Sequence, residues 1–469
     1  MRPLLVIDAV GLTAEQLGAR TPHLSKLAAR GFAAPLTAIL PAVTLSAQAT
    51  LLTGLPPTEH GAVGNGWYWR ELGEAWLWRQ PNAIVRGEKL YERARRLDLA
   101  FTCAKLFWWW NLGAAVDWSI TPRPFYPADG RKIPAIQATP REFEAHVLRE
   151  LGPFPFFDFW GPRSGLASSR WIADATKLAM REHRPTLTLA YLPHLDYDHQ
   201  RHGPRAPRSL DALSELDALV GELVAAADDA GAETLVVSEY GIEDADTPVH
   251  VNRALREAGL LEVRDTPVGE VLDPFASRAF AVADHQIAHV YVKRTNEIPK
   301  VRALLERLDG VGAVLDEAGK RAAGIAHERA GELVAVARKG AWFTYYHWLD
   351  DARAPDFART VDIHRKPGYD PCELFVDPRL AAPKLRVALR LAQKMLGMRY
   401  LMDVIPLDAG LVKGTHGRVP ERAEDGPVLV SSIARDKLLG SAGASSAGPL
   451  RLAAFPDLAL RALGFAPIR

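Results

Sequence analysis

The sequence predicts an α/β protein built on a mostly parallel central sheet. Three short apolar runs, residues 4–7, 186–191 and 234–237, have the continuous hydrophobic character of strands that are buried on both faces. The segment 209–230, between the second and third runs, places Leu and Val at helical spacing with acidic residues on the opposite face. This alternation of buried strands and amphipathic helices is typical of a parallel sheet covered by helices.

An acidic residue follows each of the three predicted strands, namely Asp8, Asp196 and Glu239. In open parallel sheets, active sites form at the carboxyl ends of the strands. We therefore expect these three carboxyl groups to meet at one edge of the sheet.

The alternating pattern weakens after residue 245, which indicates a second structural unit. Shorter candidate helices and strands follow, at residues 253–261, 288–293, 300–308 and 333–337. We therefore predict a catalytic core of residues 1–245 and 395–469. Residues 246–394 are predicted to form a smaller α+β insertion that caps the substrate side.

The composition limits the kinds of partner. The 469 residues include 57 basic and 56 acidic side chains, a formal net charge of +1, so no overall field would attract a nucleic acid polymer or an anionic membrane. No apolar run approaches the roughly 18 residues of a membrane helix. Cys103 and Cys372 are too few for a disulfide framework. We expect free thiols, no membrane partner and a cytoplasmic location, while the oligomeric state stays open.

The most informative stretch contains a threonine ahead of a predicted helix. It reads PAVTLSAQATLLTG over residues 41–54, then PPTEHG over 56–61, then Gly64-Asn65. This order resembles the nucleophile region of the alkaline phosphatase superfamily, in its type I phosphodiesterase/nucleotide pyrophosphatase branch. The resemblance implies an alkaline-phosphatase-like three-layer sandwich, with Thr44 as nucleophile and Asn65 as a donor to the phosphoryl oxygen.

The residue types suit this chemistry. A threonine hydroxyl is a weak nucleophile at neutral pH, but a divalent cation on its oxygen favours the alkoxide, and a helix N-terminus adds positive potential. Metal-bound Thr44 could then attack phosphorus, and the Asn65 amide could stabilise charge on the equatorial oxygens. The alternative role for Thr44 is a helix N-cap.

The resemblance also implies two divalent metal ions, Zn²⁺ in the first place, with Mn²⁺ or Mg²⁺ as alternatives. The ligands that it suggests are Asp8, Thr44, Asp196, Gln200, Glu239, His364 and His416. His416 stands in a Gly-Thr-His-Gly motif that is similar to a late ligand motif of the family. Asp196 begins a segment that resembles the family pattern D-x-x-x-H-x-x-G-P.

Two ligand motifs depart from the family pattern. Gln200 occupies the position of the expected imidazole, so either its amide oxygen or a neighbouring side chain, His199 or His202, would bind the ion. Glu239-Tyr240 stands where relatives have Asp-His. These changes make one site richer in oxygen, which favours Mn²⁺ or Mg²⁺ over Zn²⁺, and they leave room for the loss of one ion.

Several other side chains have roles that the sequence leaves open. His364 could bind metal or substrate, and Arg365 and Lys366 beside it could contact phosphate. His285 and His289 fall in the predicted insertion and are expected to be structural.

Two tryptophan-rich stretches, residues 67–78 and 107–110, have two possible roles. They could line a pocket that stacks on a planar group, or they could pack in the core.

The predicted function is metal-dependent hydrolysis of phosphodiesters or nucleotide pyrophosphates through a phospho- or nucleotidyl-threonine intermediate. The substrate would be a small phosphate ester or a nucleotide. A phosphomonoester or phosphonate hydrolase of the same superfamily is one alternative. A catalytically degenerate binding protein is another, because Gln200, Glu239 and Tyr240 replace expected ligands. The sequence contains neither a glycine-rich phosphate loop nor a G-x-S-x-G elbow, which disfavours other nucleotide chemistry and acyl transfer.

Overall fold

The computed structural model describes residues 1–128, 131–444 and 448–466. Within these residues a nine-stranded sheet forms the centre of the molecule, in the order β21-β2-β20-β9-β1-β8-β5-β6-β7. Its strands are β1 (Leu4–Ala9), β2 (Phe32–Thr37), β5 (Cys103–Leu106), β6 (Trp118–Pro122), β7 (Ile136–Thr139), β8 (Leu187–Leu192), β9 (Glu233–Val237), β20 (Val428–Ser431) and β21 (Leu450–Arg451). In the described part of the sheet, β7 and β20 alone run against the common direction. The predicted class, α/β with a mostly parallel sheet, is confirmed.

The three predicted strands that precede acidic residues are neighbours at the centre of this sheet. All six residues of β1 are buried, and Asp8 lies opposite Tyr191 of β8 and Val237 of β9. Because β9, β1 and β8 are parallel, their carboxyl ends share one edge. The chain therefore brings Asp8 together with the two acids that follow β8 and β9, as the sequence predicts.

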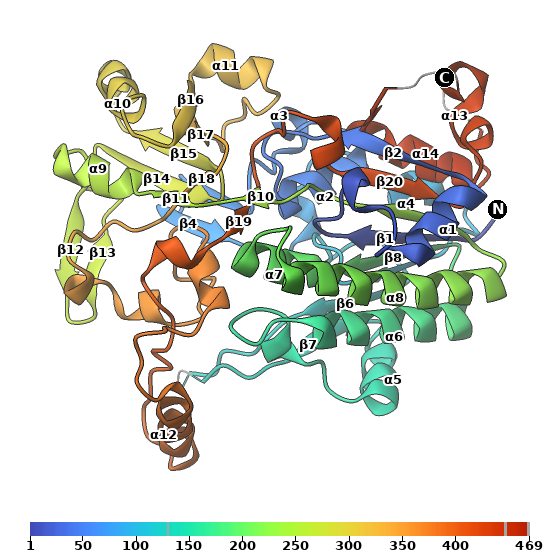
Figure 1. Ribbon diagram of the computed structural model, residues 1–469, viewed down its shortest axis with the longest axis horizontal. Coiled ribbons are helices and arrows are strands. Elements are labelled where there is room, and N and C mark those ends of the chain that lie inside the picture. Colours follow the sequence, from blue (N-terminus) through green and yellow to red (C-terminus); the bar gives the residue numbers. More distant parts are fainter. Residues whose placement is uncertain (129–130, 445–447, 467–469) are drawn as a thin grey trace.

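Helices cover both faces of the sheet and complete three layers (Figure 1). One face carries α1 (Pro22–Arg30), α5 (Arg141–Leu151), α6 (Leu166–His183), α7 (His194–His202) and α8 (Pro207–Asp229). The other carries α2 (Thr44–Thr53), α4 (Leu90–Leu97) and α14 (Phe455–Ala462). On α8 the buried side chains Leu213, Leu216, Val220 and Leu223 recur every three or four residues, which gives the helix one apolar face for the sheet.

A second, antiparallel sheet lies in the segment that the sequence assigns to the insertion. Its order is β14-β15-β17-β16, and it has a hydrophobic core of its own around Phe280, Val290 and Leu333. The elements are α9 (Val251–Glu257), β14 (Ala279–Asp284), β15 (Ile287–Val292), α10 (Ile298–Leu305), β16 (Val311–Leu315), α11 (Glu317–Ala322) and β17 (Leu333–Ala337). The end of β14 and the β14–β15 turn carry Asp284 and His285 to the core segments, where Asp284 accepts hydrogen bonds from Asn65. The residue limits of the two units stay a prediction.

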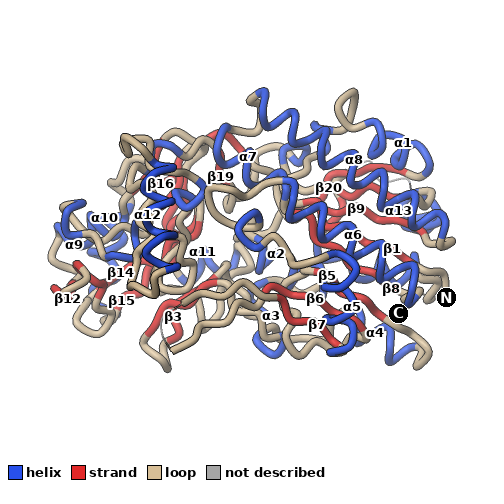
Figure 2. The backbone as a smooth tube through the Cα atoms, turned by 90° about the horizontal axis from the view of Figure 1, so that it is seen from below, coloured by secondary structure: helices blue, strands red, loops and turns tan. Residues whose placement is uncertain are grey.

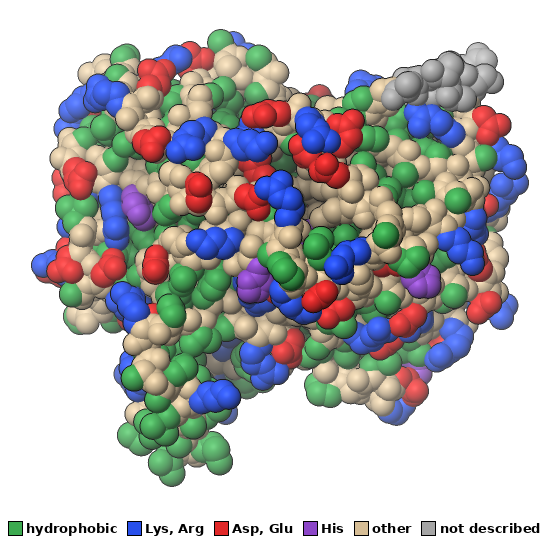
Figure 3. All heavy atoms as spheres, viewed as in Figure 1, with side chains coloured by type: hydrophobic (Ala, Val, Ile, Leu, Met, Phe, Trp, Pro, Cys, Tyr) green, Lys and Arg blue, Asp and Glu red, His purple; other side chains and the backbone are tan. Residues whose placement is uncertain are grey.

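Short elements connect and extend these two sheets. They are α3 (Pro57–His60), β3 (Gly66–Trp69), β4 (Glu74–Leu77), β10 (Glu243–Asp244), β11 (Thr247–Val249), β12 (Val263–Thr266), β13 (Gly269–Leu272), β18 (Ala341–Phe343), α12 (Pro383–Met395), β19 (Gly414–Thr415) and α13 (Arg435–Ala444). The helix α12 projects downward from the body of the molecule in Figure 1, so that it overlaps the body in the view from below of Figure 2. Hydrophobic side chains gather at its tip, whereas basic and acidic side chains are interspersed over the rest of this face (Figure 3). No helix in the described ranges has both the length and the apolar character needed to cross a membrane.

Candidate active site

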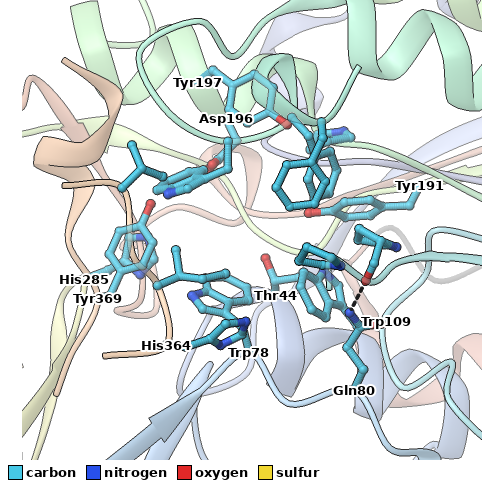
Figure 4. A pocket seen from close by; sticks show the side chains of 18 of the residues that line it. Thr44, Trp78, Gln80, Trp109, Tyr191, Asp196, Tyr197, His285, His364 and Tyr369 are labelled. Atoms are coloured by element: carbon cyan, nitrogen blue, oxygen red, sulfur yellow. Dashed lines mark hydrogen bonds between the residues drawn. The ribbon is translucent and has the colours of Figure 1, made fainter. Parts of the chain in front are cut away.

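A cavity opens at the carboxyl edge of the central sheet, and the predicted nucleophile lies in its wall (Figure 4). Its lining is mostly aromatic. The lining residues include Thr44, Trp78, Trp109, Trp160, Tyr191, Asp196, Tyr197, Tyr240, His285, His364, Tyr369 and His416. Polar groups of the central sheet thus meet an aromatic wall that is contributed by several loops.

Thr44 is the first residue of α2, and its position follows from local backbone geometry. Val43 before it is extended, with φ −134° and ψ 155°, and the helix starts immediately afterwards. Every residue of α2 is buried, so the helix N-terminus is held rigidly against the cavity. The first N–H groups of a helix have no partner within the helix, and they give the Thr44 hydroxyl a positive local potential.

Tyr240 connects Thr44 to Asp196. The Tyr240 hydroxyl lies 3.1 Å from Thr44 Oγ1 and donates to Asp196 Oδ1 at 3.4 Å. The Tyr240 ring stacks on His416, with ring centroids 3.6 Å apart and planes 6° apart. This stack fixes the phenol, so a continuous path of hydroxyl groups runs from Thr44 to a carboxylate.

Gln48 holds two further carboxyl groups together. Its Nε2 donates to Asp8 Oδ2 at 3.0 Å and to Glu239 Oε1 at 2.6 Å. Its Oε1 accepts from the Trp109 backbone N–H at 2.8 Å, which fixes the orientation of the amide. The other oxygens, Asp8 Oδ1 and Glu239 Oε2, are buried and have no hydrogen-bond partner.

Burial dominates the electrostatics of these acids. It raises the pKa of Asp8 well above its ordinary value, and the nearby Glu239 carboxylate raises it further. Burial also raises the pKa of Glu239 and the pKa of Asp196, each to about 7. No lysine or arginine among the described residues lowers the pKa of Asp8 or of Glu239. Two adjacent buried carboxyl groups thus have no cationic side chain to balance them.

The turn after β5 positions the backbone group that orients Gln48. Trp110 has a φ of 58°, a left-handed value that is strained for a tryptophan. Two hydrogen bonds fix this residue: Trp110 Nε1 donates to the Leu45 carbonyl at 3.0 Å, and the Trp110 carbonyl accepts from Lys105 Nζ at 2.8 Å. Both bonds hold the neighbouring Trp109 N–H in place.

Lys105 is fully buried, and burial lowers its pKa from 10.5 to about 7. Between pH 7 and pH 10.5, Lys105 therefore carries a proton in the unfolded chain but not in the folded chain. Protonation then favours the unfolded chain, so the contribution of Lys105 to stability falls as the pH falls from 10.5 to 7. Lys105→Met removes this penalty. We expect the stability gain of Lys105→Met over the wild type to be about 2 kcal/mol larger at pH 7 than at pH 9.

Urea unfolding of both proteins at the two pH values measures this difference. Lys384→Met, which alters an exposed side chain, is the matched control and should show the same stability effect at both pH values. A stability gain of Lys105→Met that does not vary with pH would show that Lys105 is charged in the folded chain.

Asp196 is satisfied by two donors. Besides Tyr240, Gln200 Nε2 donates to Asp196 Oδ2 at 2.7 Å, while Gln200 Oε1 accepts from the Tyr369 hydroxyl at 3.0 Å. His416 Nε2 lies 3.8 Å from Asp196 Oδ1, and His416 Nδ1 lies 2.8 Å from a backbone carbonyl, to which it donates. Burial lowers the pKa of His416 well below its ordinary value, so this imidazole is neutral.

Asn65 lies beside the start of α2. Its Oδ1 accepts from the Leu45 N–H at 3.0 Å, and its Nδ2 donates to Asp284 Oδ1 at 3.1 Å. Asp284 also interacts with His285 Nδ1, at 2.8 Å, and the His285 ring lies 3.8 Å from the ring of His416. His285, for which the sequence predicts a structural role, therefore lines the cavity.

The remaining predicted site residues lie apart from this cluster. His364 lines the cavity beside Trp78, across from Asp196 (Figure 4). Arg365 is largely exposed and pairs with an aspartate, and Lys366 is buried in ion pairs with Asp370 and Glu373. Neither of the two cations is among the lining residues, so the geometry gives no support to their predicted contact with phosphate.

The two imidazoles that flank Gln200 also lie away from the cavity. His199 is buried with both ring nitrogens unpaired, and burial lowers its pKa to about 4. His202 is partly exposed, and its Nε2 lies 3.9 Å from Asp198. Neither lines the cavity, so neither takes the position of the imidazole that Gln200 replaces.

The tryptophans divide between the two roles that the sequence leaves open. Trp78 and Trp109 line the cavity, with ring centroids 5.1 Å apart. Trp67, Trp108 and Trp110 are buried in the hydrophobic core.

The two predicted cation positions differ in the donors that they offer. Among the described residues, no three His, Cys, Asp or Glu side chains gather as a metal-binding group. At one position, Asp8 and Glu239 each keep an unpaired buried oxygen, and the Thr44 hydroxyl lies beside them, 3.1 Å from the hydroxyl of Tyr240, the residue after Glu239. With water completing the set, these donors fit one oxygen-ligated cation. At the other position, hydrogen bonds engage both Asp196 oxygens and both ends of Gln200, and His416 Nε2, 3.8 Å from Asp196 Oδ1, is left as a single free imidazole nitrogen, a set that does not fit a second cation.

Similarity to known proteins identifies the family of this chain. Residues 4–370 match the family model of type I phosphodiesterases and nucleotide pyrophosphatases. The chain belongs to this family. The family is one of phosphoric ester and anhydride hydrolases that generally depend on divalent metal ions.

Individual relatives are distant. An uncharacterized pyrophosphatase/phosphodiesterase of Schizosaccharomyces pombe is 27% identical over 224 residues, which are 47% of this chain and 40% of that protein. The chain thus spans about two fifths of the length of this curated relative.

Solved structures of the superfamily share the fold. Phosphonoacetate hydrolase from Sinorhizobium meliloti 1021, in complex with phosphonoacetate, has a TM-score of 0.62 and 17% identity, over 98% of this chain and 96% of that one. Murine ectonucleotide pyrophosphatase/phosphodiesterase 5, in complex with AMP, has a TM-score of 0.56 and 13% identity, over 100% and 96%. The predicted alkaline-phosphatase-like architecture is confirmed.

Sequence reasoning did not identify three residues that contact the predicted site residues. They are Gln48, Asp284 and Tyr369. A signal existed for Gln48, because it is a polar residue one helical turn after Thr44 in an otherwise largely apolar helix. The other two come from the predicted insertion, where no motif marks them.

Proposed function

We propose that Thr44 is the nucleophile with which this chain hydrolyses a phosphoric diester or anhydride. The observation that carries this proposal is the position of its hydroxyl, at a helix N-terminus, in the cavity wall and 3.1 Å from the Tyr240 hydroxyl. A threonine that served only as an N-cap would need neither the cavity nor the path to Asp196.

The reaction would proceed in two displacements. Thr44 Oγ1 forms a bond to phosphorus as the bond from phosphorus to the leaving oxygen breaks, and the threonine proton passes through the Tyr240 hydroxyl to Asp196. The leaving oxygen departs as an anion or takes up this proton. Water then attacks phosphorus and loses a proton, the bond from phosphorus to Oγ1 breaks, and Thr44 Oγ1 takes up a proton through the Tyr240 hydroxyl. A divalent cation bound beside Thr44 would supply a Lewis acid that favours the alkoxide.

The cavity wall supports a substrate with a planar organic group. Trp78 and Trp109 form one side, and Trp160 and Tyr369 lie 5.7 Å apart, ring to ring, on another. The rings of each pair contact one another, and their outer faces offer the cavity an aromatic surface on which a flat group could stack. Among the described lining residues Lys132 is the one lysine and there is no arginine, which favours a singly charged diester over a doubly charged monoester.

Two measurements test this proposal. The first compares hydrolysis of an aryl phosphodiester, the matching monoester and a phosphonate, and we expect the diester to be turned over fastest. The second is mass spectrometry of acid-quenched enzyme during turnover, in which we expect a phosphoryl adduct on the peptide that contains Thr44. Inversion of a chiral thiophosphate diester would exclude the covalent step, and binding without turnover of any ester would favour the degenerate binding protein.

A further inference from the structure

We infer that this site holds one oxygen-ligated divalent cation, Mg²⁺ or Mn²⁺, between Asp8, Glu239 and Thr44, and that hydrogen bonds replace the second cation of the expected pair. The inference rests on the proposed function only in that it concerns the same site. Its test does not use turnover.

The carboxylate oxygens of this site differ in whether a hydrogen-bond donor satisfies them. Asp8 Oδ1 and Glu239 Oε2 are fully buried and have no hydrogen-bond partner. A buried carboxylate oxygen without a donor or cation costs free energy. At Asp196, by contrast, the Tyr240 hydroxyl serves one oxygen and the Gln200 amide serves the other.

Gln48 fixes the orientation of Asp8 and Glu239. Because the Trp109 N–H holds the Gln48 oxygen, the Gln48 NH₂ group must face the two carboxylates. It occupies one oxygen of each, at 3.0 and 2.6 Å, and leaves the other free. Outer hydrogen bonds of this kind orient the ligands of a metal ion. Thr44 begins the helix that carries Gln48, and its hydroxyl lies 3.1 Å from the hydroxyl of Tyr240, the residue after Glu239, which places it beside the same donors.

The charge of the two acids and the types of ligand atom beside them favour one oxygen-ligated divalent cation. Asp8 and Glu239 lie side by side in the interior, and the side chain that donates hydrogen bonds to both of them is the neutral Gln48 amide rather than a lysine or an arginine. One divalent cation would balance the two carboxylates. The available donors are carboxylate, hydroxyl and water oxygens, a set that Mg²⁺ and Mn²⁺ accept and that lacks the nitrogen or sulfur ligands typical of Zn²⁺.

Hydrogen bonds around Asp196 take the place of the second cation. Tyr240 places its hydroxyl between Thr44 and Asp196, at 3.1 and 3.4 Å, and so fills the space between them. Both polar ends of Gln200 are occupied, by Asp196 and by the Tyr369 hydroxyl. Donors therefore stand around Asp196 where a cation would otherwise stand.

The experiment is a titration of the metal-stripped chain with Mn²⁺ and with Zn²⁺. Calorimetry measures the binding of both ions, and the electron paramagnetic resonance signal of free Mn²⁺ measures how much Mn²⁺ stays unbound. We expect one Mn²⁺ per chain. Glu239→Gln should weaken Mn²⁺ binding by about 100-fold or more, whereas Asp196→Asn should change it by no more than about threefold. Circular dichroism of each variant establishes that it is folded.

A variant that should gain a second cation site tests the inference without relying on a loss of binding. The double substitution Gln200→His and Tyr240→His restores two imidazoles beside Asp196 and His416, and we expect it to bind a second ion, with preference for Zn²⁺. Two ions bound by the wild type, no ion bound, or equal losses in Glu239→Gln and Asp196→Asn would each overturn the inference. One bound Mn²⁺ without hydrolysis of any ester would support the inference and contradict the proposed function.

Discussion

Thr44→Ala is expected to lower kcat for an aryl phosphodiester by about 10³-fold or more, with KM changed only a few-fold. The substitution removes the oxygen that would bond to phosphorus but leaves the aromatic wall that would bind the organic group. Thr44→Ser keeps a hydroxyl on the same atom position and should retain measurable turnover. Steady-state kinetics of the three proteins, under identical metal conditions, measures the effect.

Thr53→Ala is the matched control, because Thr53 is the last residue of the same helix. Its hydroxyl donates to the Ala49 carbonyl at 2.7 Å and has no part in the cavity. Its loss should lower stability by about 1 kcal/mol and leave kcat within about twofold. If Thr44→Ala were as active as this control, Thr44 would not be the nucleophile.

Tyr240→Phe is expected to lower kcat by about 10²-fold, because it removes the hydroxyl that lies between Thr44 and Asp196. The phenyl ring can still stack on His416, so the surrounding packing and the melting temperature should change little. Rate measurements under single-turnover conditions would place the loss in the first displacement. In the wild type the same measurement should show rapid formation of the adduct on Thr44.

The control for this prediction is Tyr191→Phe, which removes a hydroxyl from the same cavity but not from the path between Thr44 and Asp196. Its kcat should stay within a few-fold of the wild type. A Tyr240→Phe enzyme with wild-type kcat would show that Tyr240 contributes packing alone and that another group accepts the threonine proton.

Much of the fold could be predicted because its signals are local. The apolar runs that become β1, β8 and β9 are continuous since both faces of those strands are buried, and such runs are visible within a few residues. The order of these strands in a parallel sheet then brings the acids after them together. The convergence of Asp8, Asp196 and Glu239 therefore follows from residue types within three short segments.

Residues that complete the site could not be predicted in the same way. Tyr369 reaches Gln200 across 169 positions, and Asp284 reaches Asn65 across 219. No local periodicity links such pairs, because they meet only when the predicted insertion packs against the core. Lys366 is a further example, since its loop position suggested a contact with phosphate, whereas the packed fold buries it in ion pairs with Asp370 and Glu373.

The sequence by itself determined the family, the strands that end in acids and the threonine that starts α2, because each of these depends on residue types within a short segment. The tertiary structure decided which polar atoms are satisfied. It placed Gln48 between Asp8 and Glu239 and the Tyr240 hydroxyl between Thr44 and Asp196. Whether a carboxylate oxygen is free for a cation depends on donors that approach from distant parts of the chain, and only the packed fold fixes their positions.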